Sequence, residues 1–318
     1  MSIQIPLKSV EDLLLSITKS DVPLLSETSA HILSAGGKRL RPRLVLLAYE
    51  AVGGTNPDEA VPLAAAVEII HTATLVHDDI NDKGTLRRGR ETVNSRLGGT
   101  FALLTGDFLF TKTYEIMAPY SEELNSVLAK AATELVEGET LQLYTAKRGE
   151  LDRDTYYQVI AKKTAALFVA STQLGAIVAG APEEHITALA DYAFNLGMAF
   201  QITDDILDLI ADPEQLGKNA GIDLSQGRGI AAAVGHGADR DGSSARTSDA
   251  VAVAPDVAPG PLAESLTGNG SLEFAIEQGR NKAREFIERG FASLDKLPES
   301  DAREELRKLG KLVLNRDH

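Results

Sequence analysis

The chain has 318 residues, of which 43% are hydrophobic and 25% are charged, proportions typical of a soluble globular protein. Its formal net charge of −14 argues against non-specific binding to nucleic acid, which requires a basic surface. It contains no cysteine, so no disulfide can form and nothing indicates secretion. Residues 1–10 lack the pattern of a signal peptide, and no run of about 18 uncharged apolar residues predicts a membrane span. We therefore expect a cytoplasmic protein.

Apolar residues recur at three- and four-residue spacing along most of the chain, a pattern that predicts helices. No segment alternates convincingly with period two, so we expect an all-α protein packed as a helical bundle. We expect one domain that covers residues 1–318. In chain order, helices are expected at about residues 8–20, 24–35, 41–52, 62–82, 101–117, 122–145, 155–179, 183–209, 271–293 and 301–314.

The segment from Gly229 to about Gly270 differs in composition from the rest. It is rich in Gly, Ala, Ser, Asp and Pro, and no aromatic residue occurs between Phe200 and Phe274. Such a composition buries little apolar surface. We predict a surface loop or a poorly packed insertion at about residues 234–265.

A first acidic motif, DDIND at residues 78–82, lies in the helix expected at 62–82. At 100° per residue, His71, Asp78 and Asp82 lie within about 20° of one stripe of that helix. Carboxylates at positions i and i+4 repel each other and destabilise a helix. A hard divalent cation would offset the repulsion, and Mg²⁺ typically takes one or two carboxylates together with waters and phosphate oxygens.

A second acidic motif, DDILD at residues 204–208, lies in the helix expected at 183–209. Gln201, Asp205 and Asp208 share one stripe, with Asp204 beside it. Apolar neighbours adjoin these carboxylates, which indicates the wall of a cavity. One such motif alone is more often a solvated helix face or a cap. Two on long apolar helices favour a metal site.

Two clusters of basic residues stand out in this acidic chain, GGKRLRP at residues 36–42 and KGTLRRGR at residues 83–90. Each places cations beside glycines, which suits a phosphate through both charge and free N–H groups. A single cluster of this kind is more often a solvated run of charge. Next to the acidic helices, the two together indicate sites for two phosphorylated substrates.

Three further polar features are weaker candidates. Lys163, followed by Thr164, interrupts an apolar helix, where a snorkelling lysine is the commoner explanation. Lys218 comes soon after the second motif and is placed to fold back over a phosphate. His71 is either a buried structural histidine or, judged by its stripe, part of the cavity.

These segments together resemble the trans-isoprenyl diphosphate synthases, also called polyprenyl synthetases. The resemblance runs from about residue 8 to residue 228, and more weakly from about residue 271 to the end. It implies the isoprenoid synthase fold, a large antiparallel helical bundle around a central cavity, and a homodimer. It rests on GGKRLRP at 36, VEIIHTATLVHDDINDKGTLRRG at 67, LLTGDFLF at 103, EGETLQL at 137, KKTAALF at 162, GMAFQITDDILDL at 197 and GKNAGIDLSQGR at 217.

The resemblance also assigns roles to single residues. The implied metal ligands, for two to three Mg²⁺ ions, are Asp78, Asp82 and Asp204. The implied catalytic set combines both acidic motifs with two lysines: Asp78, Asp79, Asp82, Asp204, Asp205, Asp208, Lys163 and Lys218. Isopentenyl diphosphate is implied to bind at Lys38, Arg41, His71 and Arg88. The allylic diphosphate is implied to bind at Arg87, Lys163, Thr164, Gln201 and Lys218.

The implied activity is that of an all-trans polyprenyl diphosphate synthase, a prenyltransferase. Mg²⁺ stabilises the allylic diphosphate as a leaving group, the C–O bond ionises, and the double bond of isopentenyl diphosphate attacks the allylic cation. A proton is then lost to the departing diphosphate, so no protein nucleophile or base is required. A hydrophobic product leaves room for peripheral contact with a membrane.

Product length in this family depends on side chains one and two helical turns before the first motif. These are Ala73 and Thr74, followed by Ile70 and Val67. None is aromatic, so we expect geranylgeranyl diphosphate or a longer product.

Two other functions compete with this one. A terpene cyclase or a head-to-head prenyl synthase needs no site for isopentenyl diphosphate, so Lys38, Arg41 and His71 argue against both. A noncatalytic or partner subunit of a heteromeric prenyl synthase usually lacks an acidic motif, whereas both are intact here. One departure from the family is GRGIA at residues 227–231, where a Lys, a Thr and a Pro are usual. The helix after it is therefore expected to be shortened or replaced.

Overall fold

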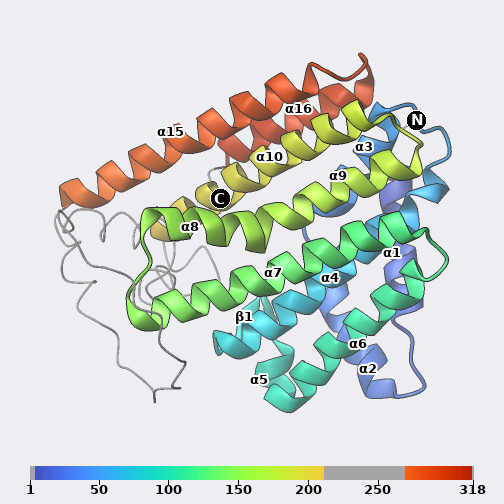
Figure 1. The fold of residues 1–318 in the computed structure, drawn as a ribbon. Helices are drawn as coiled ribbons and strands as arrows, with labels where there is room; N and C mark the ends of the chain where they lie inside the picture. Colours follow the sequence, from blue (N-terminus) through green and yellow to red (C-terminus); the bar gives the residue numbers. More distant parts are fainter. Residues whose placement is uncertain (1–3, 211–268, 317–318) are drawn as a thin grey trace.

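The computed structural model describes residues 4–210 and 269–316, and it is helical nearly throughout (Figure 1). The all-α prediction is therefore confirmed for these residues. The predicted loop at 234–265, Lys218 and the segment at 217–231 lie outside them. The elements are α1 Gln4–Ile17, α2 Pro23–Leu33, α3 Leu40–Ala51, the 3-10 turn η1 Pro57–Glu59, α4 Val61–Asn81, β1 Leu86–Arg87, β2 Arg90–Glu91, α5 Val93–Leu97, α6 Gly99–Met117, α7 Glu122–Arg148, α8 Arg153–Ile160, the π-helical turn η2 Ala161–Ala165, α9 Ala166–Val178, α10 Glu183–Ile210, α15 Asn269–Leu294 and α16 Asp301–Leu314.

Local signals account for many helix ends. Helix α7 begins after Ser121, whose hydroxyl accepts a hydrogen bond from the Leu124 N–H, and it ends at Gly149, which adopts φ 63°. A side-chain oxygen at the N-cap and a left-handed glycine after the last turn satisfy polar groups that the helix itself leaves open. Asp152 and Ser300 cap α8 and α16 in the same way as Ser121.

The long helices form two adjoining hydrophobic cores. One surrounds α10, which packs on α9 and α15, with α16 against α15 and α3. The other surrounds α4, which packs on α1, α3 and α6. Figure 1 shows α7, α9, α10 and α15 lying side by side. Helices α3 and α9 contribute to both cores and so connect them.

Helix α4 is long and strongly apolar. Residues Pro57–Asn81 are long and apolar enough to cross a membrane by composition, yet 78% of the most apolar window is buried inside the protein. The helix also carries Glu68, which is buried at 2% exposure. These are the properties of a core helix.

Two local features differ from the sequence predictions. The expected glycine-punctuated loop at 83–90 contains a short antiparallel hairpin, with Leu86 opposite Glu91 and Arg87 opposite Arg90. Its two turn residues, Arg88 and Gly89, have φ of 52° and 71°, the left-handed pair that a tight hairpin turn requires. The helix expected at 155–179 is instead divided into α8, the π turn η2 and α9.

Candidate active site

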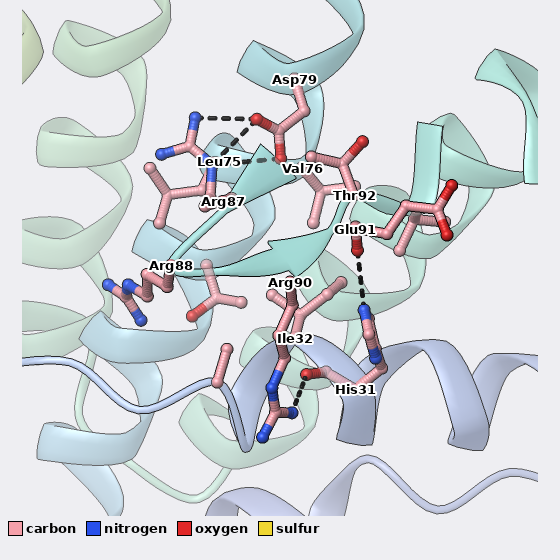
Figure 2. A pocket seen from close by; sticks show the side chains of 13 residues that line it. His31, Ile32, Leu75, Val76, Asp79, Arg87, Arg88, Arg90, Glu91 and Thr92 are labelled. Atoms are coloured by element: carbon pink, nitrogen blue, oxygen red, sulfur yellow. Dashed lines mark hydrogen bonds and ion pairs between the residues drawn. The ribbon is translucent and has the colours of Figure 1, made fainter. Parts of the chain in front are cut away.

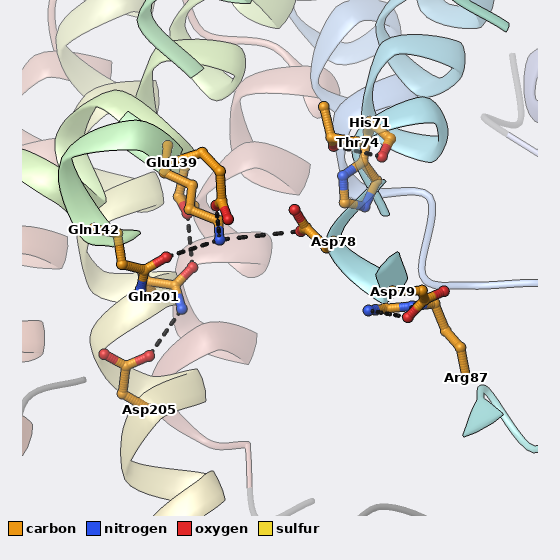
Figure 3. A network of polar contacts seen from close by, with 11 residues as sticks. His71, Thr74, Asp78, Asp79, Arg87, Glu139, Gln142, Gln201 and Asp205 are labelled. Atoms are coloured by element: carbon orange, nitrogen blue, oxygen red, sulfur yellow. Dashed lines mark hydrogen bonds and ion pairs between the residues drawn. The ribbon is translucent and has the colours of Figure 1, made fainter. Parts of the chain in front are cut away.

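The two adjacent aspartates of the first motif point in different directions. Asp79 is 7% exposed and accepts Arg87 Nε at 2.9 Å and 3.1 Å on its two oxygens, with Arg87 Nη2 2.8 Å away. Figure 2 shows this pair joining the hairpin to the end of α4. Asp78 instead faces α7, on the other side of the helix (Figure 3). The sequence grouped these residues as one motif, whereas the structure gives Asp79 a partner on the hairpin.

Asp78 lies beside a polar cluster contributed by α7 and η2. Lys163 Nζ is 4.0 Å from Asp78 Oδ2, donates to Gln142 Oε1 at 2.9 Å and forms an ion pair with Glu139. Burial raises the pKa of Asp78 to about 6, and the negative charges of Glu139 and Asp82 add to this effect against the attraction of Lys163. Asp78 is therefore a carboxyl whose charged form is disfavoured chiefly by burial.

The π turn η2 places Lys163 and Thr164, and two glycines make room for it. A Cβ at Gly138 of α7 would lie 2.6 Å from the Lys163 backbone nitrogen, and one at Gly197 of α10 would lie 2.7 Å from Ala165 Cα. Insertions of this kind re-aim side chains and are frequent at functional sites. The sequence predicted both polar residues but not the turn, because the glycines that pack against it lie on distant helices.

A chain of hydrogen bonds links η2 to the second acidic motif. Thr164 Oγ1 donates to Gln201 Oε1 at 2.7 Å, and Gln201 Nε2 donates to Asp205 Oδ1 at 2.8 Å, as Figure 3 shows. The Tyr156 hydroxyl donates to Asp205 Oδ2 at 2.7 Å. Asp205 is 6% exposed and is thus held on both oxygens, while Asp208 is half-buried one turn further along α10. Tyr156 was not predicted from the sequence.

Asp204 is the outward-facing aspartate of the second motif. Its side chain is 51% exposed, and Arg316 Nη2 is 3.6 Å from Oδ1. The Arg316 guanidinium lies over the Phe200 ring, 4.7 Å from the centroid. Burial lowers the pKa of Lys38, the charge of Arg316 adds to this, and Asp204 opposes it, so Lys38 belongs to the same neighbourhood. Arg316 belongs to no motif, so its position beside Asp204 could not be predicted from the sequence.

The two basic clusters of the sequence meet in space. The Arg88 guanidinium packs on Gly37, where a Cβ would lie 2.8 Å from Nη1, and it donates to the Gly36 carbonyl. Arg41 lies over the Phe168 ring at 4.9 Å. Burial lowers the pKa of Arg41 to about 10, with Arg88 adding to the effect. The loop before α3 and the hairpin therefore form one cationic surface.

His71 lies at the inner side of this surface, on α4. Burial holds its pKa well below the ordinary histidine value, and the charges of Arg41 and Arg88 lower it further. The imidazole is therefore neutral at neutral pH and offers a hydrogen bond rather than a charge.

Comparison with known proteins shows the family of the chain. The profile of the polyprenyl synthetase family matches residues 22–246. The chain belongs to the polyprenyl synthetase family. The octaprenyl diphosphate synthase of Escherichia coli K12 is 38% identical over 302 residues, which are 94% of this chain and 92% of that protein.

Solved structures of polyprenyl synthetases share the whole fold. A polyprenyl synthase from Caulobacter crescentus, solved with calcium and isoprenyl diphosphate, superposes with a TM-score of 0.84 at 32% identity and covers 99% of this chain and 96% of its own. Geranylgeranyl pyrophosphate synthetase from Pyrococcus horikoshii gives 0.85 and 32%, covering 98% and 96%. The predicted isoprenoid synthase fold is thereby confirmed.

A cavity of about 550 Å³ lies beside Ile70, near the middle of α4, between α6 and α7. Ile70 lines it, together with Phe110, Met117, Leu128 and Val136. Ala73 and Thr74, one turn before the first motif, are not among its lining residues. Ala73 is fully buried, and the Thr74 hydroxyl donates to the His71 carbonyl at 2.8 Å. Of the predicted chain-length residues in this polyprenyl synthetase, Ile70 is the one that reaches the cavity.

The described part of the chain brings together no ready-made metal site from protein groups alone. Within residues 4–210 and 269–316, no three His, Asp or Glu side chains lie close enough together to bind an ion. Mg²⁺ usually keeps several waters and takes one or two carboxylates plus phosphate oxygens, so a substrate-assisted site agrees with this spacing.

Proposed function

We propose that this polyprenyl synthetase is an all-trans polyprenyl diphosphate synthase. It would condense isopentenyl diphosphate with an allylic prenyl diphosphate to give geranylgeranyl diphosphate or a longer product. The observation that carries the proposal is the convergence of two acidic helix segments and one continuous cationic surface on the region between α4, α10 and η2. A single phosphorylated substrate would not require both groups, whereas two diphosphates do.

Mg²⁺ fits the acidic residues of this region. Burial, together with the nearby carboxylates, disfavours the charged form of Asp78 and raises its pKa, and a bound divalent cation would favour that charged form. Asp79 and Asp205 already accept strong hydrogen bonds from Arg87, Tyr156 and Gln201. We propose that Asp78, Asp82 and Asp204 coordinate two to three Mg²⁺ ions directly and that Asp79 and Asp205 have an orienting role. When bound, Mg²⁺ neutralises the diphosphate and stabilises it as a leaving group.

The allylic diphosphate would bind where Lys163, Thr164 and Gln201 converge. Lys163 now donates to Gln142 and pairs with Glu139, so its ammonium is held facing Asp78 before substrate arrives. Preformed donors of this kind stabilise developing negative charge without reorganisation. Arg87 and Lys218 complete the proposed set. As the C–O bond breaks, the bonding pair leaves with the diphosphate that these residues hold.

Isopentenyl diphosphate would bind at the cationic surface of Lys38, Arg41, Arg88 and His71. Arg41 Nε is buried without a hydrogen-bond partner among the described residues, which suits a group that awaits an anion. The double bond of isopentenyl diphosphate then supplies the electron pair for the new C–C bond. The proton lost afterwards passes to the departing diphosphate. Apolar residues of α4 and α9 keep water from the carbocation.

The hydrocarbon tail would extend down α4 into the cavity lined by Ile70. Both Asp78 and Ile70 lie on this helix, eight residues apart, which corresponds to about 12 Å of helix rise. Because Ile70 is the α4 residue that meets the cavity, we propose that its size limits elongation along this route.

A homodimer would cover an exposed apolar face of α6 and α7. Phe101, Leu103, Leu104 and Tyr114 are 45%, 49%, 50% and 74% exposed, and Val136 of α7 is 56% exposed. Exposed apolar patches of this kind mark interaction surfaces. We propose that a second copy of the chain buries this face.

Incubation of the purified protein with Mg²⁺, radiolabelled isopentenyl diphosphate and a single allylic primer tests the proposal. Dimethylallyl, geranyl and farnesyl diphosphate are supplied in separate reactions, and the products are dephosphorylated and sized by chromatography. We expect Mg²⁺-dependent incorporation into geranylgeranyl or longer chains. Absence of incorporation with every primer would refute the proposed activity, and a farnesyl-only product would refute the proposed length.

A further inference from the structure

The arginine between the two proposed phosphate-binding cations does not point toward the site. Arg39 follows Lys38 and precedes Arg41 by two residues, yet its side chain is only 9% exposed. Its Nη1 donates to Glu68 Oε1 at 2.7 Å, and its Nη2 donates to the Leu33 carbonyl at 2.6 Å. One guanidinium therefore joins the loop before α3 to the end of α2 and to the middle of α4.

The backbone at Arg39 explains why this anchorage matters. Arg39 is the N-cap of α3 and adopts φ 48° and ψ 42°, a left-handed conformation that non-glycine residues rarely adopt. Such a conformation persists only where the surroundings hold it. The reversal of the chain at Arg39 turns Lys38 and Arg41 toward the site while its own side chain turns inward.

Glu68 is placed to serve the cationic surface as well as Arg39. Its side chain is 3% exposed, and it precedes His71 by one turn of α4. Its charge opposes the lowering of pKa that burial imposes on Arg41 and Arg88. It is thus a buried counter-ion for these two guanidinium groups.

We propose that Arg39 and Glu68 are positioning residues for the diphosphate of isopentenyl diphosphate. The pair holds the left-handed turn before α3 in register with α4, so that Lys38, Arg41 and His71 face one anion. Neither residue touches the substrate. This inference rests on the proposed function, because it concerns the second of its two substrates.

A buried ion pair also contributes to stability, so the test separates that effect from positioning. Removing one partner leaves the other charged and unpaired, which destabilises, whereas replacing both with apolar residues of similar volume is often neutral. If the pair serves stability alone, the double replacement restores function along with folding. If it positions the turn, the double replacement restores folding but not affinity.

The experiment measures binding of isopentenyl diphosphate by calorimetry without Mg²⁺ and without an allylic primer, so that no turnover occurs. The variants are Arg39→Met, Arg39→Lys, Glu68→Gln and the double variant Arg39→Met with Glu68→Met. Arg307→Met, which removes the 2.6 Å pair with Asp295 near α16, is the matched control. Thermal unfolding of each variant and the KM for farnesyl diphosphate are measured alongside.

We expect Arg39→Met to weaken binding about tenfold, which corresponds to about 1.4 kcal/mol, while the KM for farnesyl diphosphate changes less than about twofold. Arg39→Lys, whose single amine cannot reach both acceptors, weakens binding by about threefold and serves if the methionine variant does not fold. The double variant unfolds near the wild-type temperature but still binds weakly. The control binds as wild type does.

Wild-type affinity in folded Arg39→Met and Arg39→Lys, or recovery of both stability and affinity in the double variant, overturns the positioning role. Failure of the wild-type protein to incorporate isopentenyl diphosphate at all instead refutes the proposed function. The two failures are distinguishable because the positioning test compares variants of a protein whose own turnover is measured first.

Discussion

The hydrogen bond from Tyr156 to Asp205 offers a direct test of how the second acidic motif is organised. Tyr156 is 2% exposed and Asp205 is 6% exposed, and the 2.7 Å contact joins a hydroxyl to a buried carboxylate. Tyr156→Phe deletes only the hydroxyl. A hydrogen bond to a charged group contributes about 1.5–3 kcal/mol, which for a chain of this size lowers the Tm by about 2–5 °C.

The same substitution is expected to raise the Mg²⁺ concentration that the reaction requires. Asp205 would keep Gln201 as a partner but lose its second restraint, and the loss of such a supporting contact typically costs about 10-fold to 100-fold in metal affinity or activity. The assay is the Mg²⁺ concentration for half-maximal incorporation, measured together with thermal unfolding. We expect at least a several-fold increase in that concentration.

Tyr157→Phe is the matched control for this prediction. The Tyr157 ring packs on Phe286 with centroids 6.4 Å apart, and its hydroxyl makes no hydrogen bond within the described residues. It should leave both the Tm and the Mg²⁺ dependence close to wild type. If Tyr156→Phe behaves like this control, the Tyr156 hydroxyl does not orient Asp205, and the assignment of an orienting role to that carboxylate is wrong.

Three further predictions concern other parts of the site. Asp78→Asn should abolish incorporation. Above pH 6 it should also raise the free energy of unfolding of the metal-free protein by up to about 3 kcal/mol, and with it the Tm. A pKa raised to about 6 favours the neutral carboxyl, so the stabilisation by Asp78 is present below about pH 4 and is lost as the pH rises through 6; an equal Tm gain at pH 4 would contradict this cause. Ile70→Phe should shorten the longest product seen by chromatography, since it fills the cavity, and an unchanged product would show that the tail takes another route. Leu104→Asp should yield monomers by size-exclusion chromatography with light scattering, whereas Leu312→Asp, on an equally exposed leucine of α16, should not; a Leu104→Asp dimer would exclude this face.

Most of the fold followed from short-range patterns in the sequence. The periodicity of α4 and α10 predicted both helices and the stripes on which Asp78, Gln201 and Asp205 lie, because helical geometry depends only on residue spacing. The same argument treated Asp79 as one member of a motif, since nothing local reveals that Arg87 would fold back on it. The single predicted helix over 155–179 likewise missed the π turn, which packs closely against Gly138 and Gly197 on other helices.

Contacts between distant parts of the chain were beyond these patterns. Arg316 meets Asp204 across more than a hundred residues, and neither Arg39 nor Glu68 carries a local sign that the two would pair. The GGKRLRP segment predicted three cations at one anion site, but one of the three turns inward. Identical residue types in one cluster thus take opposite directions, and only tertiary packing decides which.

Helix α4 bears Glu68, Ile70, His71 and Asp78 within three turns. A single inserted or deleted residue between Glu68 and Asp78 would rotate everything beyond it by about 100° and displace it by about 1.5 Å. The carboxylates, the imidazole and the wall of the cavity would then face different directions at once. Exchanging a side chain such as Ile70 would change the cavity alone, whereas a change in the number of residues between Glu68 and Asp78 would disturb all of these groups together.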